Sequence, residues 1–162
     1  MEKRDRKRNR LPNYDYSQTG CYFVTLCTQN RYPFFQIETD NHQSISNQII
    51  HQWLKETQKK FPHVAIDKYV IMPDHIHMIV NIRQSTPECS LEDIMWYFKT
   101  MTTNAYIRYV KSGLLPPFKQ KLWQRSYYDH VIRNQQDYNE IWEYIQYNPT
   151  KWMLMHSKDK NL

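Results

Sequence analysis

Two histidines separated by one aliphatic residue, His75-Ile76-His77, constrain the fold of this chain more than any other feature. They belong to the apolar run from Met72 to Val80, whose β-branched and aliphatic side chains favour a strand. Residues two apart on a strand point to the same face, so both imidazoles project together, about 6.5–7 Å apart at their Cα atoms. This spacing suits two nitrogen ligands of one cation, although a packed or solvated histidine pair is the commoner outcome of such a pattern.

Hydrophobic periodicity on either side of this strand predicts an alternation of strands and helices. We expect extended segments at 21–28, 64–72, 75–82 and 123–132. We expect helices at 44–61, 90–110 and 134–148, with Ser90 and Asn134 as N-caps and Pro149 as the stop of the last helix. The order matches an α+β, ferredoxin-like (split β-α-β) domain, in which helices cover one face of an antiparallel sheet and a C-terminal helix follows.

The charge of the chain is concentrated at its start. The 162 residues carry a formal net charge of +6 and fit one domain. We expect a basic N-terminal arm at 1–12, a single catalytic domain at 13–155 and a short polar tail at 156–162. Such an arm favours a polyanion, most often nucleic acid, and a merely solvated terminus is the alternative. The 13 Tyr, 6 Phe and 5 Trp residues offer rings that can stack on unpaired bases.

Composition also excludes several classes of protein. The only glycines are Gly20 and Gly113, too few for a phosphate-binding loop of a nucleotide-cofactor fold. Three cysteines without a Cys-x-x-Cys pair indicate reduced thiols. No apolar run approaches 18 residues and the N-terminus is too polar for a secretory signal, so we expect a cytoplasmic protein that does not enter a membrane.

The last predicted helix supplies the second half of a candidate site. Tyr144 and Asn148 are four residues apart, which places them on one helical face. Facing the histidine pair, they would add an amide-oxygen ligand and a phenolic nucleophile beside a metal. Tyr147 is a competing nucleophile but lies about 100° around the helix from Asn148. The alternative is a tyrosine-rich helix that only packs on the sheet, and Pro149 places Asn148 at a frayed helix end.

Three motifs together resemble a known family, the REP-associated tyrosine transposases of the single-tyrosine HUH (His-hydrophobic-His) endonucleases. They are Met72 to His77, Trp123 to Asn134 and Tyr144 to Pro149, and the resemblance spans about residues 10 to 153. It implies a ferredoxin-like fold that binds single-stranded or hairpin DNA, such as repetitive palindromic elements. It also implies metal-dependent strand cleavage that leaves a 5′-phosphotyrosine and a free 3′-OH.

The resemblance assigns roles to individual residues. It makes His75, His77 and Asn148 metal ligands and Tyr144 the nucleophile. The implied cation is Mg²⁺ or Mn²⁺, and the two imidazoles favour Mn²⁺, or Zn²⁺ in vitro. Related insertion-sequence transposases usually have Gln at the position of Asn148, so Asn favours the REP-associated group. The family includes dimers and monomers, so a homodimer is one of two open states.

Further residues are candidates for DNA contact. Candidate phosphate contacts are Arg4, Arg6, Lys7, Arg8, Arg10, Lys99, Arg108, Lys119, Lys121, Arg125 and Arg133. Each of the six outside the arm is, on its own, more typical of a solvated surface charge. His130 either shapes the DNA site or packs, and Trp123 either stacks on a base or belongs to the core.

Three functional hypotheses remain open from the sequence. The first is a metal-dependent single-strand DNA endonuclease and strand transferase. The second is a non-catalytic nucleic-acid-binding module with a ferredoxin-like fold, for which Tyr144→Phe would change nothing. The third is a small zinc hydrolase that uses His75 and His77 with a water in place of Tyr144, although the sequence offers no convincing third His or Asp ligand.

Overall fold

A computed structural model describes residues 11–157 of the protein, and the basic arm up to residue 10 lies outside the described residues. Within this range the strands form a four-stranded antiparallel sheet in the order β2-β3-β1-β4. The strands are β1 (Gly20–Cys27), β2 (Val64–Met72), β3 (His75–Ile82) and β4 (Tyr128–Ile132). The helices are α1 (Ile45–Lys60), α2 (Leu91–Lys111) and α3 (Gln135–Ser157), and a 3-10 turn, η1 (Gln29–Arg31), follows β1. This order and pairing confirm the predicted ferredoxin-like class.

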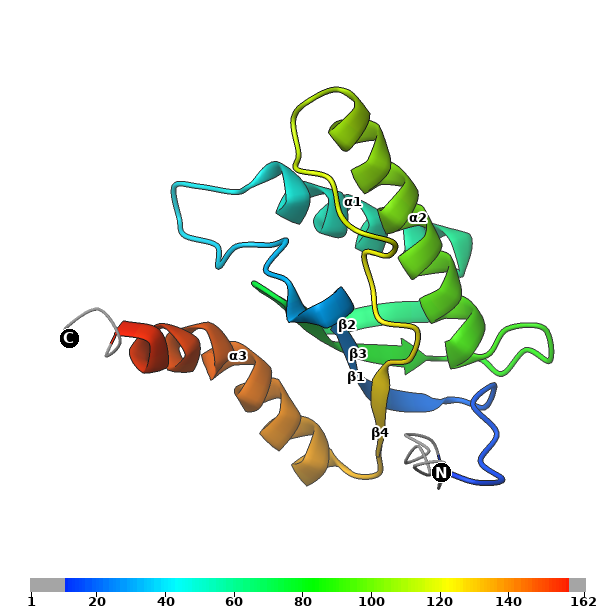
Figure 1. Cartoon of the computed structure of the whole chain (residues 1–162). Helices are drawn as coiled ribbons and strands as arrows, with labels where there is room; N and C mark the ends of the chain where they lie inside the picture. Colours follow the sequence, from blue (N-terminus) through cyan, green and yellow to red (C-terminus); the bar gives the residue numbers. More distant parts are fainter. Residues whose placement is uncertain (1–10, 158–162) are drawn as a thin grey trace, which may run out of the picture.

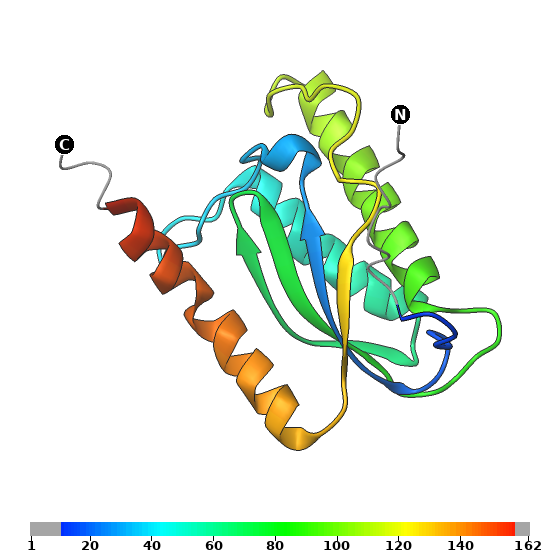
Figure 2. The same cartoon turned by 60° about the horizontal axis from the view of Figure 1, so that its bottom comes forward.

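The sheet is covered on both faces. Helices α1 and α2 pack together on one face, and α3 runs along the other (Figures 1 and 2). Strand β3 is central and covered on both sides, which explains why its sequence is apolar almost without interruption. No helix within residues 11–157 is long and apolar enough to cross a bilayer.

The main core lies between the sheet and the α1–α2 pair. Alternate residues of the central strands, such as Val24, Ile76 and Met78, are fully buried there against Phe98 of α2. Helix α2 begins with a capping box in which Ser90 and Asp93 satisfy each other's backbone N–H groups, so the predicted cap is confirmed. Because Ile76 faces this core, its two histidine neighbours must point to the α3 face.

The predicted end of the last helix at Pro149 is wrong. Helix α3 continues through Pro149 to Ser157. Proline removes one backbone N–H donor, but the helix lies at the surface, where water can satisfy the carbonyl that is freed. The following turn is supported by stacking of Trp152 on His156, whose ring centroids lie 4.3 Å apart. Asn148 is therefore inside a helix rather than at a frayed end.

The predicted extended segment 123–132 forms a strand only over its second half. Only Tyr128–Ile132 pairs with β1, and Trp123 makes an isolated bridge to Thr28. The first half leaves the sheet because the Trp123 ring turns into the core, where its Nε1–H donates to Thr102 at 3.0 Å. The structure thus favours the core over base stacking for this tryptophan, which is 4% exposed.

Replacing Trp123 with alanine is expected to lower the free energy of unfolding by about 3–5 kcal/mol, because it empties a large buried volume and removes a buried hydrogen bond. Urea denaturation followed by circular dichroism measures this loss as a lower midpoint at unchanged slope. The matched control is Trp96→Ala on exposed α2 surface, expected within about 0.5 kcal/mol of wild type. A stable Trp123→Ala protein with weakened DNA binding would contradict the core assignment.

Candidate active site

Strand pairing places the two histidines side by side on the α3 face of the sheet. In the β1–β3 register, His75 lies opposite Cys27 and His77 opposite Thr25. Their ring centroids are 4.6 Å apart. The two residues are 7% and 6% exposed, so both imidazoles are almost completely withdrawn from bulk water. A buried polar pair of this kind requires hydrogen-bond partners or a ligand.

Each imidazole has one nitrogen engaged by a neighbour. His75 Nδ1 lies 2.6 Å from an oxygen of Asp74, and because a carboxylate only accepts, Nδ1 carries the proton. His77 Nδ1 lies 2.8 Å from the hydroxyl of Thr25. Among residues 11–157, no hydrogen bond engages either Nε2 atom. This is the pattern of metal-binding histidines, whose second nitrogen is oriented by a carboxylate or other polar group.

The electrostatics keep both rings neutral. Burial lowers the pKa of His75, although Asp74 opposes this effect. Burial lowers the pKa of His77 to about 3, and the neighbouring His75 and Arg31 add to this shift. At neutral pH both imidazoles therefore have the uncharged form that binds metals.

Helix α3 brings the two other predicted site residues to the histidines. Its buried Ile145 anchors the helix on the sheet, and Tyr138 donates a hydrogen bond to Asp67 of β2 at 3.0 Å. Tyr144 then faces His77, with 5.3 Å between ring centroids. A cavity of about 250 Å³ is lined by all four predicted residues of this one chain: His75, His77, Tyr144 and Asn148.

Five further residues of this cavity were not predicted from the sequence: Thr25, Arg31, Lys151, Trp152 and Met155. Arg31 is held in place because its Nε–H donates to Asp74 at 3.0 Å. Lys151 and Trp152 were missed because Pro149 was expected to end the helix before them. The cavity thus joins two neutral imidazoles, a phenol and an amide with two cationic side chains, a composition suited to a phosphodiester.

The competing nucleophile and the competing hydrolase fit this geometry less well. Tyr147 is 66% exposed and does not line the cavity with the histidines. No group of three or more His, Cys, Asp or Glu side chains that could hold a metal occurs in the described part of the chain. A third protein ligand beside His75 and His77 would therefore be the amide oxygen of Asn148, rather than the additional His or Asp that a zinc hydrolase would use.

Within residues 11–157, the remaining candidates for DNA contact do not line the active-site cavity. The predicted arm residues, Arg4, Arg6, Lys7, Arg8 and Arg10, lie outside the described residues. Arg108 and Arg133 are exposed but do not line the cavity. His130 is exposed and pairs with Asp137 at 2.8 Å, at the start of α3. Lys99 of α2 and Arg125 line a separate cavity.

Fold and site together define a ferredoxin-like domain in which a histidine pair on the sheet faces a helix-borne tyrosine. The sequence model of the family "Transposase IS200 like" matches residues 17–148. The chain belongs to this family and is a DNA transposase, and the resemblance inferred from its motifs is confirmed.

Individual relatives and solved structures are similar to this chain over most of its length. An uncharacterized protein of Haemophilus influenzae is 31% identical over 91% of this chain and 89% of its own length. The REP-associated tyrosine transposase of Escherichia coli K12 is 28% identical over 84% of this chain and 70% of its own. Among solved structures, a REP-associated tyrosine transposase bound to a REP hairpin superposes with a TM-score of 0.59 at 20% identity, covering 88% of this chain and 73% of that one. A transposase described as putative, from Deinococcus radiodurans, gives a TM-score of 0.54 at 16% identity, over 85% and 95% of the two chains.

Proposed function

We propose that this transposase cleaves one strand of DNA beside a hairpin by attack of Tyr144 on a phosphodiester, and that it does so with a divalent cation. The observation that carries the proposal is the single cavity shared by Tyr144, Asn148 and the histidine pair. Hairpin DNA is the proposed partner because a solved relative of the same fold is described as bound to a REP hairpin. The proposed place of action is the cytoplasm.

The residues fit the implied cation. The Nε2 atoms of His75 and His77 and the amide oxygen of Asn148 would hold it, while Asp74 and Thr25 orient the rings through Nδ1. A mixed nitrogen and oxygen set of this kind accepts Mn²⁺ readily and Mg²⁺ less readily. When bound, the cation supplies charge neutralisation of a non-bridging phosphate oxygen.

The side chains of the chain perform the rest of the reaction. The Tyr144 oxygen forms a bond to phosphorus, the bond from phosphorus to the 3′ oxygen breaks, and the products are a 5′-phosphotyrosine and a free 3′-OH. The phenolic proton leaves to solvent and the departing 3′ oxygen gains a proton. Arg31 and Lys151, which line the same cavity, provide positive charge against the phosphate. The covalent bond conserves the energy of the phosphodiester for later rejoining.

Cleavage of end-labelled hairpin DNAs tests the proposal. We expect cleavage with Mn²⁺ or Mg²⁺ and none with excess chelator. The 3′ end of the cut should be extended by a polymerase, and the 5′ product should stay bound to protein until protease treatment increases its mobility in the gel. Equal cleavage in chelator, or a free 5′-phosphate in the product, would contradict the mechanism. Tight hairpin binding without cleavage of any DNA would favour the non-catalytic binding module.

A further inference from the structure

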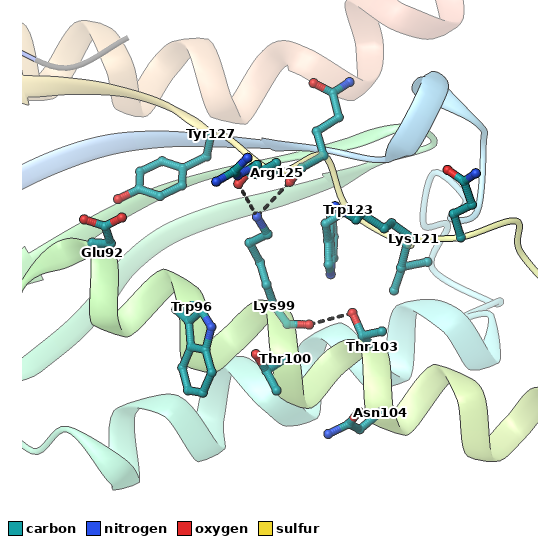
Figure 3. Close-up of a pocket in the computed structure, with 13 residues that line it drawn as sticks. Glu92, Trp96, Lys99, Thr100, Thr103, Asn104, Lys121, Trp123, Arg125 and Tyr127 are labelled. Carbon is teal, nitrogen blue, oxygen red and sulfur yellow. Dashed lines mark hydrogen bonds between the residues drawn. The ribbon is translucent and has the colours of Figure 1, made fainter. Parts of the chain in front are cut away.

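A second cavity, of about 470 Å³, lies between α2 and the segment 120–127, and we call it the α2 cavity. Figure 3 shows it as a trough with Trp96, Thr100 and Asn104 of α2 along one side and Arg125 on the opposite side. Its volume falls within the range of small-ligand pockets. None of the residues that line it lines the active-site cavity.

The walls of this cavity are fixed by buried or charged contacts. The ammonium group of Lys99 donates to the carbonyl oxygens of Gln124 and Arg125, at 2.7 and 2.9 Å (Figure 3). Trp123, which also lines the cavity, is anchored to Thr102 of α2. These bonds hold the segment at a set distance from α2, so the cavity is a built feature of the fold.

The surface chemistry of the cavity suits a nucleotide. Trp96 is 67% exposed, the most exposed of the five tryptophans, and its indole offers a flat face without a role in the core. Lys99, Lys121 and Arg125 outnumber the one acid, Glu92, by three to one. Hydroxyl and amide groups of Thr100 and Asn104 provide donors and acceptors for a base edge. Stacking on an exposed ring beside positive charge is how proteins bind unpaired bases.

A further hollow on the surface adjoins this cavity. This hollow, of about 300 Å³, shares Lys121 with the α2 cavity and adds Tyr32 and Lys119. The same hollow is lined by Gln29, which belongs to the η1 turn with Arg31 of the active site. Lys119, Lys121 and the exposed ring of Tyr32 therefore extend the basic and aromatic surface of the cavity as far as the η1 turn that also carries Arg31.

We propose that the α2 cavity binds an unpaired base of the single-stranded DNA that flanks the hairpin. The base stacks on Trp96, and the adjoining phosphates contact Lys121 and Arg125. The inference rests on the proposed function and deepens it, because it adds a recognition site for the flanking strand to the site of cleavage.

Binding measurements in chelator test this proposal without catalysis. Fluorescence anisotropy compares a blunt hairpin with the same hairpin carrying a single-stranded flank. Trp96→Ala is expected to weaken binding of the flanked hairpin about tenfold, the usual effect of losing one stacked base, and to leave the blunt hairpin unchanged. Tyr109→Ala, on α2 but outside the cavity, is the matched control and should bind both DNAs as wild type does.

The DNA partner of Trp96 is then located by replacing flank nucleotides with abasic ones in turn. One position should reproduce the tenfold loss in wild type and have no effect in Trp96→Ala. Arg125→Gln should reduce the salt dependence of log K for the flanked hairpin by about 0.7, as one lost single-strand phosphate contact predicts. Equal affinity of Trp96→Ala and wild type for the flanked hairpin would overturn the proposal, and so would an equal loss with both DNAs.

The outcome is separable from that of the proposed function. If the wild-type protein forms the covalent adduct but its affinity for the flanked hairpin does not depend on Trp96, only the proposed base site is overturned. If the affinity for the flanked hairpin depends on Trp96 but no adduct forms, the result supports the base site and contradicts the cleavage mechanism.

Discussion

Tyr144→Phe is expected to abolish the covalent protein–DNA adduct and to reduce strand cleavage by at least about 10³-fold, because no other group of the cavity can form the phosphotyrosine bond. The ring itself remains, with its edge contacts to Phe23 and His77, so the fold and hairpin affinity should be unchanged. Denaturing gels of labelled hairpin with Mn²⁺ measure the adduct, and anisotropy measures binding.

Tyr147→Phe is the matched control for this experiment. It makes the same chemical change three residues away, on a side chain that does not line the active-site cavity, and should leave the adduct at wild-type levels. The reverse result, with an adduct in Tyr144→Phe and none in Tyr147→Phe, would transfer the nucleophile to Tyr147. It would also mean that α3 rotates on the sheet before it reacts.

Replacing His75 and His77 together with alanine is expected to remove Mn²⁺ binding and cleavage while hairpin binding is largely retained. The two Nε2 atoms are the only nitrogen donors that the described residues offer to the proposed metal, so an amide oxygen alone cannot hold it. Titration calorimetry with Mn²⁺ measures the loss directly. Circular dichroism verifies the fold, since both residues are buried in the sheet.

Two further variants test how the metal affinity depends on the residues around the histidine pair. Asp74→Asn keeps the ring of His75 but weakens its orienting partner, and should lower metal affinity about 10- to 100-fold. His130→Ala alters an exposed histidine paired with Asp137 and should leave metal affinity as in wild type. If the folded double variant lost hairpin binding as completely as cleavage, the histidines would be recognition residues and the metal site would have to be abandoned.

Local sequence patterns predicted the parts of this site that depend on one element. The two-residue period of β3 separates Ile76 from its histidine neighbours whatever the rest of the fold does. In the same way, a helix through Tyr144 and Asn148 aligns them without reference to the sheet. The capping box at Ser90 is equally local. Such features follow from the backbone geometry of a single segment.

The parts that were missed depend on packing between distant segments. Thr25 meets His77 across 52 residues of sequence, and Arg31 meets Asp74 across 43, through strand pairing and the η1 turn. Pro149 is a poor signal for the end of α3 because the cost of a proline depends on whether the helix is exposed there. The contribution of Lys151 and Trp152 follows from that helix and could not be inferred without it.

The placement of the proposed catalytic groups along the chain has a consequence for synthesis. The whole sheet, with both histidines, is complete at Ile132, whereas Tyr144 and Asn148 arrive with the last helix. A nascent or truncated chain that stops before α3 therefore possesses the scaffold and two of the three proposed metal ligands but lacks the proposed nucleophile. Under the proposed mechanism, a translation product that stops before α3 cannot form the covalent bond to DNA, because Tyr144 is absent from it.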